Sequence, residues 1–206
     1  MKLNVNATRM EFLKLRKRTS IAKRGHKLLK DKQDELMERL LAMTKKVEEL
    51  REKVEEELAR TTKKFLLARA GMEPDFVEEA LLIPTKRVEV ELEEKNLLNV
   101  KIPVLRQSVS GEIISYGYHE TSPELDAALY SLDKAIGDLL ELAAMEKTLE
   151  LIAVEIEKTR RRVNALEYIL IPNLEETLRY IVMKLSEIER STLSRLMRIK
   201  DIVRAH

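Results

Sequence analysis

The sequence predicts a mainly α-helical protein, a long antiparallel two-helix coiled coil with a small β-hairpin insert between the helices. Apolar heptad patterns extend over residues 8–70 and 123–204, and part of the stretch between them alternates apolar and polar residues. A helix rises about 1.5 Å per residue, so the two helices span roughly 95 and 120 Å. Helices of this length cannot form a compact globule from 206 residues, and we therefore expect a rod.

The composition agrees with a coiled coil. Charged residues make up 36% of the chain and aromatic residues 4%, and there are five glycines and five prolines. The net charge of +2 conceals a segregation, because residues 1–32 carry +9 and residues 73–94 carry −6. This polarity favours oriented docking with charged partners. Without cysteine, long apolar runs or a signal-peptide layout, we expect a soluble chain in a reducing compartment that reaches a membrane only through a partner.

The first predicted domain, residues 1–73, is a coiled-coil helix. Thr8 and Glu11 fit a capping box at its start, and Gly71 and Pro74 stop it. Leu50, Val54 and Leu58 are separated by two successive steps of four residues, which interrupts the alternating 4-3 spacing of the seam and is called a stutter. The apolar stripe weakens near the start, at Met10, Leu13, Ile21, Leu28 and Leu29. The seam that faces the partner helix is clearest, with 4-3 spacing, at Leu36, Leu40, Met43, Val47, Leu50 and Val54.

The second predicted domain is the insert, residues 74–121. Residues 75–82 are expected to form a short helix. Two alternating runs, 88–92 and 98–104, predict the strands of a hairpin with one buried face and a polar turn at 93–96. A lone hairpin is marginally stable in water, so we expect this one to rest on a helix or on a partner.

The third predicted domain, residues 122–206, is the second long helix. Ser122 followed by Pro123 is a helix-start signal. Pro172 lies inside the pattern and bends the helix axis, either as a tolerated kink or, as we favour, as a functional curvature of the shaft. The expected seam comprises Leu125, Leu129, Leu132, Ile136, Leu139 and Ala143, then Val163, Leu166 and Leu170, then Leu178, Ile181, Leu185 and Ile188.

Motifs of catalysis are missing from the sequence. The glycines form neither GxxxxGK[ST] nor GxGxxG, so no phosphate-binding loop is predicted. His26, His119 and His206 are far apart, with none of the spacings of metal ligands. Acidic runs such as Glu55–Glu57 lie beside basic residues and indicate a solvated helix face. We expect no catalytic, metal or cofactor site and a chain that is not itself an enzyme.

The basic end of the coiled coil allows three interpretations. In an antiparallel pair of helices, residues 8–32 are expected to lie beside the basic residues of 190–204. Such an end can bind nucleic acid, although Phe12 is its only aromatic side chain and platforms for base stacking are scarce. It can equally enter an acidic protein cavity, or be a solvated helix end.

Two stretches carry a family resemblance. One runs from Thr8-Arg9 to IAKRGHKLLKDKQDEL at 21–36, and the other is KTRRRVNALEY at 158–168, which includes Arg161, Arg162, Asn164 and Glu167. With Ile171-Pro172, 177–181, Ile102-Pro103 and Tyr116-Gly117, they closely resemble the D subunit of the V-type and archaeal A-type rotary ATPases over the whole chain. Two departures are Ala7, where the family often has proline, and Asn99, where it often has glycine.

This resemblance implies a non-catalytic central rotor stalk, functionally similar to the gamma subunit of F-type ATPases. Its termini would enter a catalytic hexamer of alternating A and B subunits. The small F subunit would clasp its side, and its lower end would meet the C subunit (called d in the V-type) at the membrane ring. The chain would couple proton or sodium transport to ATP synthesis or hydrolysis, without a cofactor, at the cytoplasmic face of the cell membrane. The basic residues expected at the rotor tip are Arg9, Arg16, Lys17, Arg18, Arg195, Arg198 and Arg204.

Two other function classes remain as alternatives. Prefoldin-type holdases also join terminal helices through β-hairpins, but they grip clients with apolar surface and their subunits are much shorter. The charged tip expected here counts against that class. A basic coiled-coil arm that binds nucleic acid is the third possibility.

Overall fold

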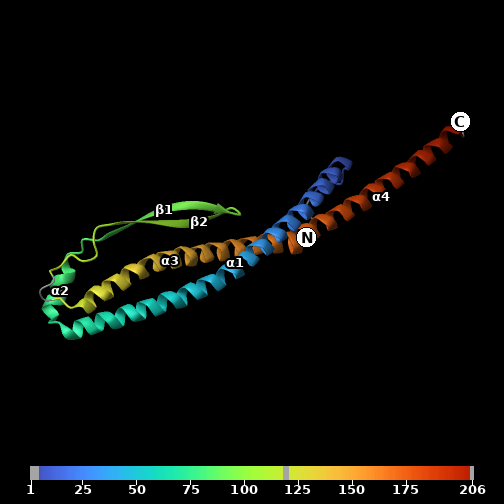
Figure 1. The fold of residues 1–206 in the computed structure, drawn as a ribbon. Coiled ribbons are helices and arrows are strands. Elements are labelled where there is room, and N and C mark those ends of the chain that lie inside the picture. The colour runs from blue at the N-terminus through green and yellow to red at the C-terminus, as the bar shows by residue number, and fades with distance from the viewer. Residues whose placement is uncertain (1–4, 118–120, 205–206) are drawn as a thin grey trace. The chain divides into compact units, whose positions relative to one another are not determined.

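The computed structural model describes residues 5–117 and 121–204 and confirms the predicted fold class. Long helices at both ends of the chain flank a two-stranded antiparallel hairpin (Figure 1). The contacts divide the chain into two compact units, Met1–Glu35 with Ile156–His206, and Leu36–Glu155. The elements in order are α1 (Arg9–Gly71), α2 (Pro74–Leu82), β1 (Arg87–Leu97), β2 (Val100–Ser110), α3 (Pro123–Asn164), the π-helical η1 (Ala165–Leu170) and α4 (Ile171–Arg204).

The helix ends follow the predicted signals, with one difference at the start of α1. The Thr8 hydroxyl accepts a hydrogen bond from the Glu11 amide at 3.3 Å, which is one half of a capping box. The Glu11 carboxylate does not complete the box, because the Thr8 amide donates instead to the Asn6 carbonyl at 2.9 Å. At the start of α3, the Ser122 hydroxyl accepts from the Glu124 amide at 3.1 Å.

In the unit Leu36–Glu155, α1 packs with the predicted seam. Leu36, Val47 and Val54 are buried, and the other predicted seam residues of α1 are half-buried. The seam of α3 agrees with the prediction only in part. Leu125 is buried and Leu139 packs against the core of Val47 and Val54, as expected, but Ala128, Ala135 and Leu142 are buried as well and Ala143 is exposed. The reason is that α3 packs on two sides. Its second face carries leucine and isoleucine residues toward the insert, and these line a pocket with Pro84, Val88 and Ile113: Leu129, Leu132 and Ile136.

The hairpin turn is tighter and later than predicted. Leu97 pairs with Val100, so the turn consists of two residues, Leu98 and Asn99, with φ of 50° and 67°. Two positive φ values are typical of a type I′ turn, whose twist matches that of the strands. Asparagine tolerates this conformation better than most residues other than glycine. The predicted turn at 93–96 is wrong, because those residues pair within the ladder.

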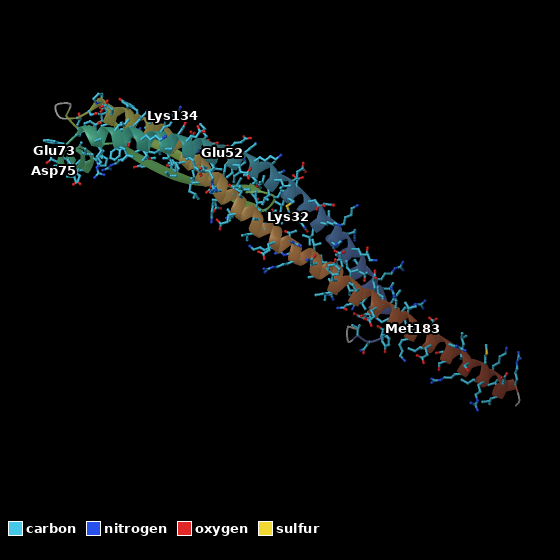
Figure 2. All side chains as sticks on the ribbon, turned by 90° about the horizontal axis from the view of Figure 1, so that it is seen from below. Lys32, Glu52, Glu73, Asp75, Lys134 and Met183 are labelled. Atoms are coloured by element: carbon cyan, nitrogen blue, oxygen red, sulfur yellow. The ribbon has the colours of Figure 1, made fainter. Side chains whose placement is uncertain are left out.

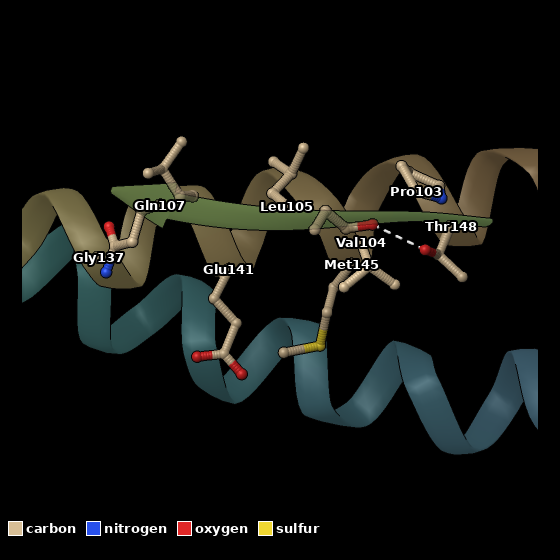
Figure 3. A pocket seen from close by; sticks show the side chains of 10 residues that line it. Pro103, Val104, Leu105, Gln107, Gly137, Glu141, Met145 and Thr148 are labelled. Carbon is tan, nitrogen blue, oxygen red and sulfur yellow. Dashed lines mark hydrogen bonds between the residues drawn. The ribbon is translucent and has the colours of Figure 1, made fainter. Parts of the chain in front are cut away.

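The hairpin rests on α3, but it does not bury one whole face as predicted. Val100 is its only buried residue among those described, whereas Val90 and Leu92 remain 44% and 64% exposed. Residues of β2 and α3 line an open pocket of about 400 Å³ (Figure 3), among them Val104, Leu105 and Ala144. The dashed line in Figure 3 is the bond from the Thr148 hydroxyl to the Ala144 carbonyl, 2.8 Å.

The other unit packs the start of α1 against α4. Its core consists of Leu15, Ala22, Leu174 and Ile181. The seam of this part of α1 differs from the expected stripe, because Leu13 and Ile21 are exposed. The residues that are buried instead include Ala22 and Thr19, which are small or polar and do not stand out in an apolar pattern.

The π-helical turn precedes Pro172 and changes the spacing of the seam. The Ile171 amide donates to the Leu166 carbonyl, five residues earlier. The seam takes two successive steps of four there, through Leu166, Leu170 and Leu174. A turn wider than an α-helical one keeps these three residues on one side of the helix. The spacing of the seam therefore changes immediately before Pro172.

Several seam positions hold threonine. Thr19, Thr61 and Thr148 are buried, and each hydroxyl donates to the carbonyl four residues earlier at 2.8–2.9 Å. The polar atom of each side chain is thus satisfied within its own helix.

Candidate partner-binding surfaces

The last part of α4 extends beyond its packing partner. Lys23 Nζ lies 2.6 Å from Glu175 Oε1, and His26 Nε2 lies 3.3 Å from Glu167 Oε2. These pairs set an antiparallel register in which the start of α1 lies beside the first part of α4. Every described residue from Ser186 to Arg204 is exposed (Figure 2). The prediction that residues 8–32 lie beside residues 190–204 is therefore wrong.

We call this exposed segment, residues 186–204, the overhang. It is both basic and apolar. Arg195, Arg198 and Arg204, three of the basic residues named from the sequence, are exposed. Its large apolar side chains, including the predicted seam residue Ile188, are between 52% and 69% exposed: Ile188, Leu193, Leu196, Met197, Ile199, Ile202 and Val203. A single sequence shows their spacing, but only the register of α1 and α4 reveals that no described helix covers them.

The other predicted tip residues lie on the first turns of α1. Arg9, Arg16, Lys17 and Arg18 are all exposed. They belong to the same compact unit as the overhang, so the structure brings the two basic groups into one unit without placing them directly side by side. Lysine and arginine at this density make a strongly positive surface that favours acidic partners.

The family-motif residues gather around η1. Arg161 pairs with Glu157, one helical turn earlier, and Glu167 reaches across to His26 on α1. Arg162 lines an apolar pocket with Leu29, Leu166 and Ile169. Asn164 and Pro172 are exposed. Short π-helical turns inside α-helices are frequent at functional sites.

Ion pairs between helices stabilise each unit. Lys23 lowers the pKa of Glu175 below its ordinary value through their hydrogen bond. In the other unit, Lys53 Nζ lies 2.7 Å from Asp138 Oδ2 and lowers the pKa of that carboxyl. Both pairs favour the charged carboxylate, so they support the helix register at neutral pH.

The end of unit Leu36–Glu155 that holds α2 is acidic and partly apolar. Glu73, which precedes α2, and Asp75, in its first turn, are both exposed (Figure 2). Leu82 and Ile83 are 75% and 74% exposed at the end of that helix. This end thus presents carboxylates and aliphatic side chains together.

None of the helices within residues 5–117 and 121–204 is both long and apolar enough to span a bilayer. Within the same residues, no group of three or more His, Cys, Asp or Glu side chains is placed to hold a metal ion. His119 and His206 lie outside the described residues.

Comparisons with known proteins agree over nearly the whole chain. A family model for the ATP synthase D subunit matches residues 11–201. The V-type ATP synthase D subunit of Clostridium botulinum (strain Langeland) is 54% identical, over 98% of this chain and 96% of the relative. The proteins of the same name from Acetivibrio thermocellus and Thermoanaerobacter sp. (strain X514) are 50% and 51% identical, over 98% of this chain and 92% and 97% of theirs. The chain therefore belongs to the family of ATP synthase D subunits.

Proposed function

We propose that this chain is the non-catalytic central rotor stalk of a V-type ATP synthase. It transmits torque between the membrane ion-translocating ring and a catalytic hexamer of alternating A and B subunits. The single observation that carries the proposal is the family match over residues 11–201, with relatives more than half identical. Helices as long as α1, with 63 residues, suit a stalk that transmits force along its length. Coupled to the ring, the stalk links proton or sodium transport to ATP synthesis or hydrolysis.

The exposed surfaces suggest how the chain meets its partners. We assign the overhang and the first turns of α1 to the hexamer. The arginines of these segments would face acidic side chains, and the apolar residues Leu193, Leu196 and Met197 would contact an apolar collar. The acidic end at Glu73 and Asp75 is assigned to the C (or d) subunit above the ring. The F subunit would clasp the side of the coiled coil, and the complex would lie at the cytoplasmic face of the cell membrane.

Add-back to a depleted complex tests this proposal. The A and B subunits are assembled without this chain, and the chain is then added with or without its overhang, truncated after Leu185. We expect the full chain to copurify with the hexamer and to restore ATP-driven rotation, and the truncated chain to bind weakly. The chain alone should release no phosphate from ATP. Failure to copurify, either with reconstituted subunits or from native membranes, contradicts the proposal.

The exposed apolar overhang also favours one rival. A holdase grips unfolded clients through apolar surface, and Leu193, Leu196 and Met197 provide such a surface in the free chain. In an aggregation assay with a heat-unfolded client protein, suppression at equimolar chain that disappears on truncation after Leu185 supports the holdase. Under the stalk proposal the chain leaves aggregation unchanged. A parallel gel-shift assay with duplex and single-stranded DNA tests the nucleic-acid alternative.

A further inference from the structure

The outer edge of β1 is a row of unpaired backbone groups. The sheet consists of β1 and β2 alone, so each strand pairs on one side. The two residues that flank a two-residue turn, here Leu97 and Val100, form a hydrogen-bonded pair. From that pair onward, hydrogen-bonded and non-bonded pairs alternate along an antiparallel ladder. The amides and carbonyls that point away from β2 therefore belong to every second residue of β1: Val88, Val90, Leu92, Glu94 and Asn96. No turn, loop or cap among the described residues bonds to them.

The two edges of the hairpin are not equivalent. Pro103 pairs with Glu94 at a non-bonded position, so its missing N–H interrupts the outer edge of β2. Neighbouring β2 residues also line the pocket against α3, among them Val104 and Leu105. In contrast, β1 contains no proline, and its central residues are exposed. An exposed edge strand of this kind is a template for a further strand.

The side chains of β1 give this edge a chemical character. Its odd-numbered face carries Glu89, Glu91 and Glu93, of which Glu93 is bound to Arg106 at 3.0 Å. Glu89 and Glu91 are exposed and form no ion pair within the described residues, although Arg106, which is bound to Glu93, lies opposite Glu91 in the ladder. The even-numbered face exposes Val90 and Leu92. Along the edge, therefore, carboxylates alternate with aliphatic side chains.

We propose that the outer edge of β1 binds an extended segment of another protein in which basic residues alternate with apolar ones. The segment adds a third strand, with main-chain bonds to the five outward residues. Its lysine or arginine side chains lie opposite Glu89 and Glu91, and its apolar residues contact Val90 and Leu92. A second copy of β1 is a poor occupant, because antiparallel registers that overlap its acidic residues place one carboxylate opposite another.

Hydrogen exchange of individual amides in the full chain tests the proposal. The probe is a synthetic peptide of about nine residues, a common strand length, that alternates lysine with valine or threonine. We expect the five outward amides to exchange at least tenfold more slowly in its presence. The odd-numbered amides of β1, which already bond to β2, should change little. A matched peptide with glutamate in place of lysine should give no protection.

Two variants separate edge binding from unspecific attraction. Leu92→Pro removes an outward N–H without removing a ladder bond, so it should abolish protection while the odd-numbered amides stay slow. The double reversal Glu89→Lys, Glu91→Lys should transfer the preference to the glutamate peptide. The same reversal at Glu78 and Glu79 on α2, both exposed, should leave the preference unchanged. The proposal is overturned if the lysine peptide protects no outward amide, or if both peptides protect them equally in the unaltered chain.

Discussion

Leu174 and Leu193 lie on the same helix in opposite environments, 0% and 58% exposed. Replacing Leu174 with alanine removes three buried carbon groups. At about 0.8 kcal/mol each, the transfer term alone is about 2.4 kcal/mol. The cavity left among Leu15, Ala22 and Ile181 adds to this, so the free energy of unfolding should fall by about 2.5–5 kcal/mol. Leu193→Ala should change it by no more than about 0.5 kcal/mol, as for most surface positions.

Urea unfolding of the purified chain, followed by circular dichroism at 222 nm, measures both changes. If the two variants lose equal stability, the overhang is packed in solution and the register described for α1 and α4 is wrong. A loss below about 1 kcal/mol for Leu174→Ala would mean that this core does not hold α4. For binding to the hexamer we expect the opposite order. Leu193→Ala should weaken binding more than Leu174→Ala, because it removes part of the proposed contact with the hexamer.

Three further predictions concern charge, backbone and pH. The first variant exchanges four basic residues of α1 for glutamine: Arg9, Arg16, Lys17 and Arg18. It should weaken binding to the hexamer and flatten the salt dependence of that binding in titrations. Four residues are exchanged together because a single exposed ion pair contributes only about 0–1 kcal/mol. Unchanged affinity at low salt contradicts this. Pro172→Ala should fold and assemble at least as well, because proline costs about 3 kcal/mol relative to alanine inside a helix. It should nevertheless lower the turnover of the reconstituted motor, and full turnover would mean that Pro172 is only a tolerated kink. Asp138 has a lowered pKa in the folded state, so its pairing with Lys53 is fully stabilising above the unfolded-state pKa of about 3.9 and is lost as the pH falls further. The stability difference from Asp138→Asn should therefore shrink below about pH 4 in acid-unfolding curves, and a constant difference would refute the pairing.

The sequence predicted the α1 seam well because one partner helix covers it, so its apolar residues recur with one period. Leu36, Val47 and Val54 are buried as expected. On α3 the prediction held only in part: Leu125 is buried and Leu139 packs against the core of Val47 and Val54, but other residues of the helix are buried as well. Two faces of α3 are covered: the larger residues Leu129 and Ile136 line the pocket against the insert, whereas Ala128 and Ala135 are buried outside that pocket. A prediction based only on the spacing of leucines cannot separate two covered faces of one helix, and it assigns their residues to a single seam.

Two other features depended on information that is not local. The hairpin turn was expected at 93–96 because that stretch is polar, but a two-residue turn requires positive φ, and Leu98 with Asn99 supplies it without the usual glycine. The offset between α1 and α4 depends on contacts such as Lys23 with Glu175, which one sequence cannot reveal. The basic residues of the proposed hexamer-binding surface could be named from composition, whereas the apolar residues of the overhang could not.

The buried threonines have a consequence for engineering. Because the hydroxyls of Thr19, Thr61 and Thr148 bond within their own helices, they contribute little to the choice of partner helix or register. Valine has nearly the same shape, and at these positions it would replace a satisfied hydroxyl with apolar surface. The interior thus offers a route to a more heat-resistant chain that leaves every exposed arginine, the overhang and the hairpin edge unaltered.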